Sequence, residues 1–354
     1  MVFTDNSEHN ENHQQHEEKP DSQAMLKGYR IVCAKLGLSM CVYFIFRLLA
    51  SEASFLLFGA IRNMSLTAQY VIHSALVVIM VYIIPLLITA LIFKSFKNYK
   101  GKFRTLYKKP KRFARAMGAF PATFGLGHGT ALLTLLVSFL ISRAIGGETF
   151  IEDLLRPPTV ETTTNMASVF MMMFMLVIIA PIFEEIWTRG IMYDALKPYG
   201  TGMAIIISSL IFGIMHGSLS MLFYTTAYGL ALGYIRYATD SLLIVTILHA
   251  IVNSIAAVML LLLSLSEIIV EPSRMLATVT NLYTIAVVVL ILIGVIVFLT
   301  KIPAIRKFEI ENSWTDIGPW KKIGWFLVSV PVIIMLVLAF NEHVNGWLLS
   351  LILG

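Results

Sequence analysis

Apolar runs recur along most of this chain and limit the folds that are open to it. The runs expected to cross a bilayer cover residues 31–61, 70–93, 120–145, 167–192, 203–216, 219–237, 242–263, 282–299 and 325–340. Only α-helices and closed β-barrels satisfy every backbone polar group inside lipid. The apolar–polar alternation of barrel strands is missing here. We therefore predict an all-α fold, a polytopic transmembrane helical bundle of about eight to nine spans.

Composition favours the same class. Of the 354 residues, 57% are hydrophobic and only 14% are charged, whereas a soluble domain carries about 25% charged residues. The two cysteines, Cys33 and Cys41, are separated by a helical rise of roughly 12 Å, which is too far for a disulfide. We expect both to be small packing residues.

The charge distribution predicts the orientation of the chain. Segment 94–115 holds ten Lys and Arg residues and no acidic residue, and it follows a predicted span. The positive-inside rule explains this run without a nucleic acid partner. Contact with anionic membrane lipids is then expected. With this segment in the cytoplasm, the N-terminus is also cytoplasmic and the acidic loop 146–165 is outside. We expect a multi-pass protein of a prokaryotic plasma membrane.

Three polar clusters interrupt the apolar second half of the chain. They contain Glu184, Glu185 and Arg189, then Phe212 and His216, and then His249 and Asn253. Each cluster alone also suits interfacial charge or ordinary packing. Ionisable groups at bilayer depth are costly, however, and are normally kept for function. On three neighbouring helices, these groups could activate water and hold an oxyanion.

The spacing within the clusters suggests how the side chains divide their tasks. Glu185 and Arg189 are four residues apart and can pair, which leaves Glu184 as the freer carboxylate. His249 and Asn253 share one helix face for the same reason. Neutral imidazoles and a carboxylate suit a zinc site. The same groups can also activate water without a metal, and both alternatives stay open.

The three motifs resemble those of a known protein family. Glu-Glu-x-x-x-Arg, Phe-x-x-x-His and His-x-x-x-Asn, in this order on successive helices, are similar to the type II CAAX prenyl endopeptidase and bacteriocin-processing family (CPBP, or Abi) of intramembrane proteases. Segment 229–253 also resembles the usual lead-in to the third motif. The resemblance covers residues 167–264. One departure is Thr188, where an aromatic residue often precedes the arginine.

The resemblance implies a role for each polar side chain. Glu184 and His216 would activate water, His249 and Asn253 would stabilise the oxyanion, and Glu185 and Arg189 would structure the site. The family is classed with metalloproteases, but a metal-free water activated by glutamate has also been proposed for it. A zinc ion held by Glu184, His216 and His249 therefore remains an alternative.

These observations divide the chain into four parts. We expect a disordered cytoplasmic tail over 1–27, N-terminal transmembrane helices over 28–165, a CPBP-like catalytic core over 166–264 and C-terminal transmembrane helices over 265–354. No signal-peptide h-region is visible in residues 1–25.

The leading functional hypothesis is an intramembrane endopeptidase. Its substrate would be a membrane-associated protein or peptide, either of CAAX type or a leader, bacteriocin or signal peptide. A non-proteolytic membrane immunity or scaffold protein is the main alternative, because some family members are associated with bacteriocin self-immunity. A transporter fits less well, because the polar residues gather in one third of the chain and no inverted repeat is evident.

Overall fold

The structure, a computed structural model, describes residues 22–94, 107–110, 113–145, 165–269, 274–306 and 317–343. Helices are the only regular elements in these ranges, which confirms the all-α class. The tail up to residue 21, nearly all of the acidic loop 146–165 and most of the basic segment 94–115 lie outside the described residues. The first helix begins at Ser22, within the stretch assigned to the tail.

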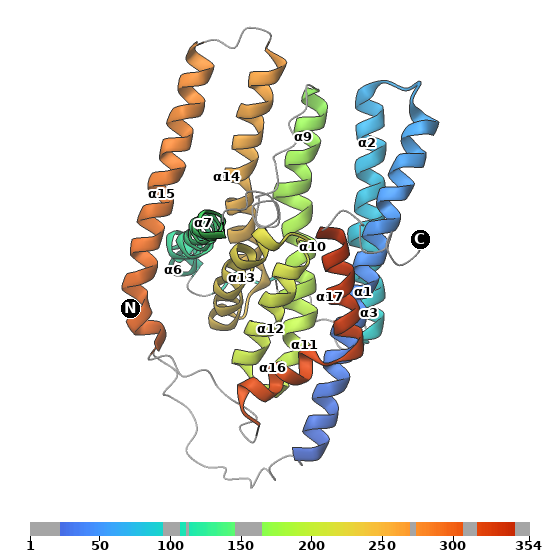
Figure 1. Ribbon diagram of the computed structural model, residues 1–354, viewed down its shortest axis with the longest axis vertical. Coiled ribbons are helices and arrows are strands. Elements are labelled where there is room, and N and C mark those ends of the chain that lie inside the picture. The colour runs from blue at the N-terminus through green and yellow to red at the C-terminus, as the bar shows by residue number, and fades with distance from the viewer. Residues whose placement is uncertain are drawn as a thin grey trace.

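Helices that run along the longest axis form the frame of the molecule (Figure 1). They are α1 (Ser22–Ile61), α2 (Leu66–Val77), α9 (Met166–Phe174), α14 (Leu242–Ile268) and α15 (Arg274–Arg306). Large apolar side chains stay exposed on this frame, among them Leu282, Ile285 and Leu292 of α15. Apolar patches of this extent are rare on soluble proteins and are expected on a surface that faces lipid. Multiple long apolar helices thus agree with a multi-pass integral membrane protein.

Two of these helices change their hydrogen-bond register and then continue. Helix α2 passes through the π-helical η1 (Val78–Ile83) into α3 (Ile84–Ile92), and α9 passes through η2 (Met175–Ile179) into α10 (Ala180–Glu185). A proline follows each π segment, Pro85 in α3 and Pro181 in α10. In a regular α-helix, the proline ring would clash with the carbonyl four residues earlier, and the π register avoids this contact. The chain then runs on through η3 (Ile186–Met192), α11 (Tyr193–Leu196) and η4 (Lys197–Tyr199).

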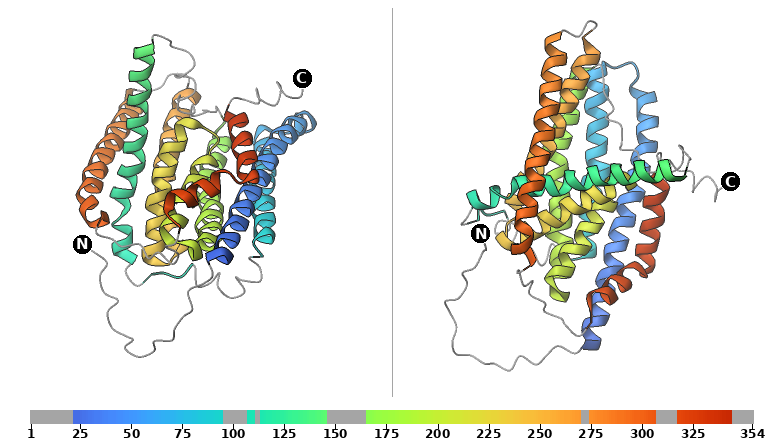
Figure 2. Two further views of the ribbon diagram at one scale, coloured as in Figure 1. Left: turned by 60° about the horizontal axis from the view of Figure 1, so that its bottom comes forward. Right: turned by 60° about the vertical axis from the view of Figure 1, so that its left-hand side comes forward.

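Other helices pack against or across this frame. They are α6 (Phe113–Met117), α7 (Phe120–Ile145), α12 (Thr201–Ile214), α13 (Leu219–Thr239), α16 (Pro319–Leu327) and α17 (Val330–His343). Helices α7 and α13 are seen end-on in Figure 1, and Figure 2 shows α7 running across the direction of α15. Helix α17 packs along α1.

The structure corrects the predicted number of spans. Among the described residues, six helices are long and apolar enough to cross a membrane, or seven if α16 and α17, bent by 68°, count as one span. The prediction of a span at 203–216 was wrong, because the 14 residues of α12 rise only about 21 Å, less than the roughly 30 Å of the hydrocarbon core. The span expected at 219–237 was also wrong, because threonine, tyrosine and glycine dilute the apolar residues of α13.

The buried core has two parts that meet near α12. One part surrounds α1, α11 and α12 and contains Tyr29, Phe44 and Trp187. The other surrounds α13 and α14 and contains Phe212. Cys33 and Cys41 are free and buried, in agreement with the predicted packing role.

The approach of α12 to α13 depends on Gly213. A Cβ atom at this position would lie 2.1 Å from Oγ1 of Thr226 and 2.8 Å from the carbonyl oxygen of Leu222. Both distances are shorter than van der Waals contact, so any side chain here must push the two helices apart. Because Gly213 directly follows Phe212, this close contact with α13 also fixes where Phe212 and the end of α12 lie.

We predict that Gly213→Ala destabilises the protein by about 1–3 kcal/mol, because the added methyl group overpacks the contact between α12 and α13. Thermal unfolding of the detergent-purified protein measures the effect. Gly59→Ala is the matched control, because nothing lies within 4 Å of its Cβ position and α1 gains a better helix former there. Equal melting temperatures for the two variants would contradict the prediction.

Candidate active site

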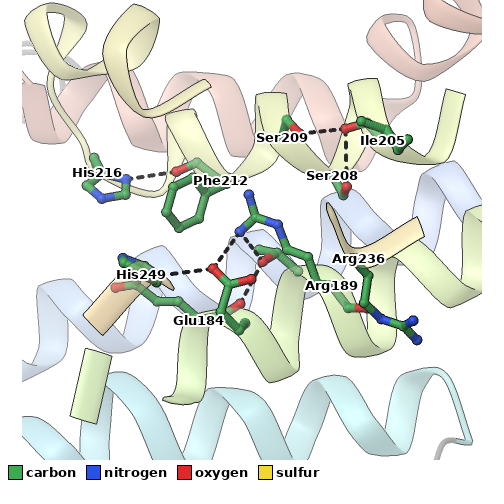
Figure 3. Close-up of polar contacts among 11 residues, drawn as sticks. Glu184, Arg189, Ile205, Ser208, Ser209, Phe212, His216, Arg236 and His249 are labelled. Atoms are coloured by element: carbon green, nitrogen blue, oxygen red, sulfur yellow. Dashed lines mark hydrogen bonds and ion pairs between the residues drawn. The ribbon is translucent and has the colours of Figure 1, made fainter. Parts of the chain in front are cut away.

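The three polar clusters of the sequence come together at one level of the bundle. Glu184, Glu185 and Arg189 come from α10 and η3, His216 lies just beyond the end of α12, and His249 and Asn253 come from α14. In Figure 3, the side chains of Phe212 and Arg189 lie between the helices that carry them, and His216 and His249 lie at the same end of the view as Glu184. Residues that are far apart in the chain thus form one site.

A buried ion pair forms the base of the site. Arg189 Nη1 donates to Glu185 Oε1 at 3.1 Å, and both side chains have no exposed surface. This is the pairing that the spacing of four residues predicted. Arg189 Nη1 also lies 2.7 Å from the hydroxyl oxygen of Thr188. A buried pair of this kind is costly to break from one side only, because the remaining charge has no partner.

Glu185 also holds His249. The same Oε1 atom lies 2.9 Å from His249 Nδ1. Because an ionised carboxylate only accepts hydrogen bonds, Nδ1 of His249 carries the hydrogen. The other ring nitrogen, Nε2, then points toward Glu184, whose Oε2 is 3.9 Å away. Glu185 therefore fixes both the position and the orientation of the His249 ring.

Glu184 is the more accessible of the two carboxylates, as the spacing predicted. Its side chain is 15% exposed, whereas that of Glu185 is fully buried. The Thr188 hydroxyl donates to the backbone carbonyl of Glu184 at 2.6 Å and leaves the carboxylate to face the cavity. Thr188, the one departure from the family's pattern, therefore contacts both the backbone of Glu184 and the guanidinium of Arg189.

His216 is held by the end of its own helix. Its Nδ1 atom lies 2.8 Å from the carbonyl oxygen of Phe212, which can only accept, so Nδ1 carries the hydrogen. The chain turns immediately afterwards at Gly217, which has a φ of 63° that glycine adopts readily. The free Nε2 of a neutral His216 ring is then an acceptor for a proton.

Phe212 connects the three clusters, a role that was not predicted for it. Its ring meets the rings of His216 and His249 edge to face, at centroid distances of 5.0 and 5.5 Å. The guanidinium carbon of Arg189 lies 4.3 Å from the same ring's centroid, a cation–π contact. The aromatic residue of Phe-x-x-x-His is therefore a spacer between the two imidazoles and the buried arginine.

Asn253 also lies on α14, but its hydrogen-bond partner is a backbone carbonyl outside the three motifs. Its Nδ2 atom donates to the carbonyl oxygen of Leu176 in η2 at 2.9 Å. The structure thus places Asn253 one turn beyond His249, against the helix that carries Glu184.

A cavity of about 480 Å³ opens beside Glu184 and His216. Helix α1 and the α2–η1 segment form its other walls, with Tyr43, Arg47 and Tyr82 among the lining residues. Arg47 Nη1 donates to the carbonyl oxygen of Met215 at 2.9 Å, and the Tyr43 hydroxyl donates to the same atom at 3.3 Å. No role was predicted for Arg47 and Tyr43; the available signal was their spacing of four residues on α1, which places them on one helix face.

The described side chains do not form a group suited to a metal ion. No three His, Cys, Asp or Glu side chains in the described part of the chain lie together as metal ligands would. His249 Nδ1 lies 2.9 Å from Glu185 Oε1, and its Nε2 lies 3.9 Å from Glu184 Oε2. A zinc site at Glu184, His216 and His249 therefore stays the alternative to a metal-free activation of water.

A comparison with known protein families agrees with the resemblance of the three motifs. Residues 166–255 match the family model described as type II CAAX prenyl endopeptidase Rce1-like. No curated protein and no solved structure matches the chain. The match begins at the start of α9, ends just beyond Asn253 in α14, and so contains all three clusters. The segment in which Glu184, His216 and His249 converge is therefore a domain of the type II CAAX prenyl endopeptidase Rce1-like (CPBP) family, a family of proteases.

Proposed function

We propose that this protein is an intramembrane endopeptidase that hydrolyses a peptide bond of a membrane-associated protein or peptide. The observation that carries the proposal is that Glu184 and His216, which come from different helices, line the same cavity. A water molecule between a carboxylate and an imidazole acceptor can be deprotonated as it attacks a carbonyl. Either a CAAX-type protein or a leader, bacteriocin or signal peptide would supply such a bond at the membrane.

The proposed reaction uses the protein's own side chains. Glu184, assisted by His216, takes a proton from water, and the hydroxide oxygen bonds to the scissile carbonyl carbon. The carbonyl π electrons move to oxygen and form a tetrahedral oxyanion. When this oxyanion collapses, the C–N bond breaks and protonated Glu184 returns its proton to the leaving amine. The result is one carboxylic acid and one amine for each water consumed.

His249 is the proposed oxyanion donor. Its Nδ1–H is already directed at Glu185, so donation to substrate requires a hydrogen on Nε2 as well. The ring is then an imidazolium between two carboxylates. With Glu184 and Glu185 negative and Arg189 and His249 positive, the buried cluster has no net charge, which is the condition for keeping four ionised groups in a low-dielectric site. Asn253, one turn further on, is the second proposed donor.

Helix α1 is proposed to support this site from outside the matched domain. Arg47 and Tyr43 both donate to the carbonyl oxygen of Met215, the residue before His216. The Tyr43 ring also meets the ring of Trp187 in the first motif, at a centroid distance of 5.3 Å. Side chains of α1 therefore contact both the segment that carries His216 and the segment that carries Glu184. We propose that these contacts hold His216 opposite Glu184.

We predict that Glu184→Gln and His249→Ala both abolish cleavage, and that Glu184→Gln, which keeps the buried contact of His249 with Glu185, does so without loss of the folded protein. A glutamine amide cannot accept the proton from water and an alanine cannot donate to the oxyanion, so turnover falls by at least about 100-fold in either variant. Mass spectrometry of membrane and medium peptides from cells that carry each form provides the measurement. A peptide that is cleaved only with wild type supports the protease, and its sequence identifies the substrate. Identical peptide profiles from all three forms would refute the protease and favour the immunity or scaffold function.

We predict that chelators leave this cleavage unchanged. The described side chains bring no three metal ligands together, and the proposed steps need none. Purified protein is assayed with the identified peptide after treatment with 1,10-phenanthroline, alongside a zinc protease of known sensitivity. Loss of cleavage that zinc restores would overturn the metal-free mechanism and support the zinc alternative.

We predict that Arg47→Gln lowers kcat about 10- to 100-fold, because a displacement of about 1 Å at a reacting group costs this much. Arg47→Lys keeps a cationic donor and recovers part of the loss. Arg62→Gln is the charge-matched control, because Arg62 is exposed just after the end of α1. A similar loss in Arg62→Gln would mean that the lost positive charge itself matters, and that the contact of Arg47 with Met215 does not.

A further inference from the structure

In the helix that carries Glu184, one backbone carbonyl lacks its helical hydrogen bond. In η2 the amide of Ala180 bonds to the carbonyl of Met175, five residues earlier. The next amide in this register would bond to the carbonyl of Leu176, but residue 181 is a proline and has no N–H. The Leu176 carbonyl is therefore left without its backbone donor, in a helix where lipid offers no replacement.

Asn253, on another helix, donates the hydrogen bond that this carbonyl lacks. Its Nδ2 atom donates to the Leu176 carbonyl at 2.9 Å, a contact between residues 77 positions apart in the chain. A side-chain amide carries two N–H groups on one nitrogen. One of them is used by Leu176, and this bond fixes the plane of the amide. Within the part of the chain that the structure describes, the second N–H has no hydrogen-bond partner, and Asn253 lies one turn after His249 on α14.

We propose that Pro181 is a positioning residue for the reaction. By removing the backbone donor, it exposes the Leu176 carbonyl as an anchor for the Asn253 amide. The anchored amide then holds its second N–H ready for the oxyanion of the substrate. The inference rests on the proposed protease function and adds a residue outside the three motifs to its machinery.

A second helix of this protein shows that the proline alone does not create such an anchor. In η1 the amide of Ile84 bonds to the carbonyl of Ile79, and Pro85 follows, so the Met80 carbonyl is equivalent to that of Leu176. Among the hydrogen bonds of the described residues, none runs from a side chain to Met80. The anchor thus requires both the proline and an amide placed opposite it on a neighbouring helix.

The proposal makes a specific prediction for Pro181→Ala. Alanine restores the amide and removes the ring that favours the π register. In a π register the new amide of residue 181 takes the Leu176 carbonyl, and in an α register the amide of Ala180 takes it. Either way the backbone competes with Asn253 for the same oxygen. The Asn253 amide is released, and the donor for the oxyanion is no longer pre-organised.

The experiment is a double-mutant cycle on the peptide cleaved by wild type. Pro181→Ala, Asn253→Ala and the double variant are compared for kcat and KM, and their melting temperatures confirm that they are folded. We expect Pro181→Ala to lower kcat about 10-fold or more with KM within about threefold, because the contact acts in the transition state. In the Asn253→Ala background, the same change should alter kcat by less than about twofold, because the group on which it acts is gone.

Pro85→Ala is the matched control, because it restores an amide after the other π segment, and its kcat should stay within about threefold of wild type. Asn253→Asp keeps the size of the side chain but cannot donate to Leu176, and it should lose as much kcat as Asn253→Ala. Equal losses from Pro181→Ala in both backgrounds would overturn the proposal and mean that the proline acts on Glu184 through the helix alone. Wild-type kcat in Pro181→Ala would also overturn it. An inactive wild type would instead count against the proposed function.

Discussion

The buried contact between Glu185, Arg189 and His249 is the interaction on which the site depends. It joins the first motif helix to α14 through a single oxygen atom that is shared by a guanidinium and an imidazole. Removal of one partner from such a buried pair costs about 3–5 kcal/mol, because the other charge loses its compensation. Adjacent helical residues point about 100° apart, so Glu184 cannot take part in the same pair and faces the cavity instead. One fixed and one accessible carboxylate follow directly from two consecutive glutamates.

The backbone contributes to the site as much as the side chains do. The π segment before Pro181 shifts the hydrogen-bond register one turn ahead of Glu184. His216 and Asn253 are both held by backbone carbonyls, the first by Phe212 at 2.8 Å and the second by Leu176 at 2.9 Å. Carbonyl oxygens only accept, so each bond also fixes which atom of the side chain carries hydrogen. In a medium without water, free backbone acceptors are scarce and become specific anchors.

Local rules predicted part of this arrangement. The pairing of Glu185 with Arg189 and the greater accessibility of Glu184 follow from helical spacing and could be predicted from the sequence. The two missing spans could not, because apolar content alone does not separate a helix that crosses a membrane from a short or tilted one buried in protein. The hydrogen bond from Asn253 to Leu176 could not be predicted either, because it needs the relative placement of two helices and a change of register that Pro181 only suggests.

The chemistry and the surface beside it come from different parts of the chain. All proposed catalytic groups lie within residues 166–255, whereas α1 and the α2–η1 segment form much of the cavity wall opposite Glu184. Arg47 and Tyr43 reach from that wall to the turn that carries His216. A substrate in the cavity would therefore contact helices outside the matched domain as well as the proposed catalytic groups. Under the proposed function, the choice of peptide would then depend on α1 and α2 as well as on the three motifs.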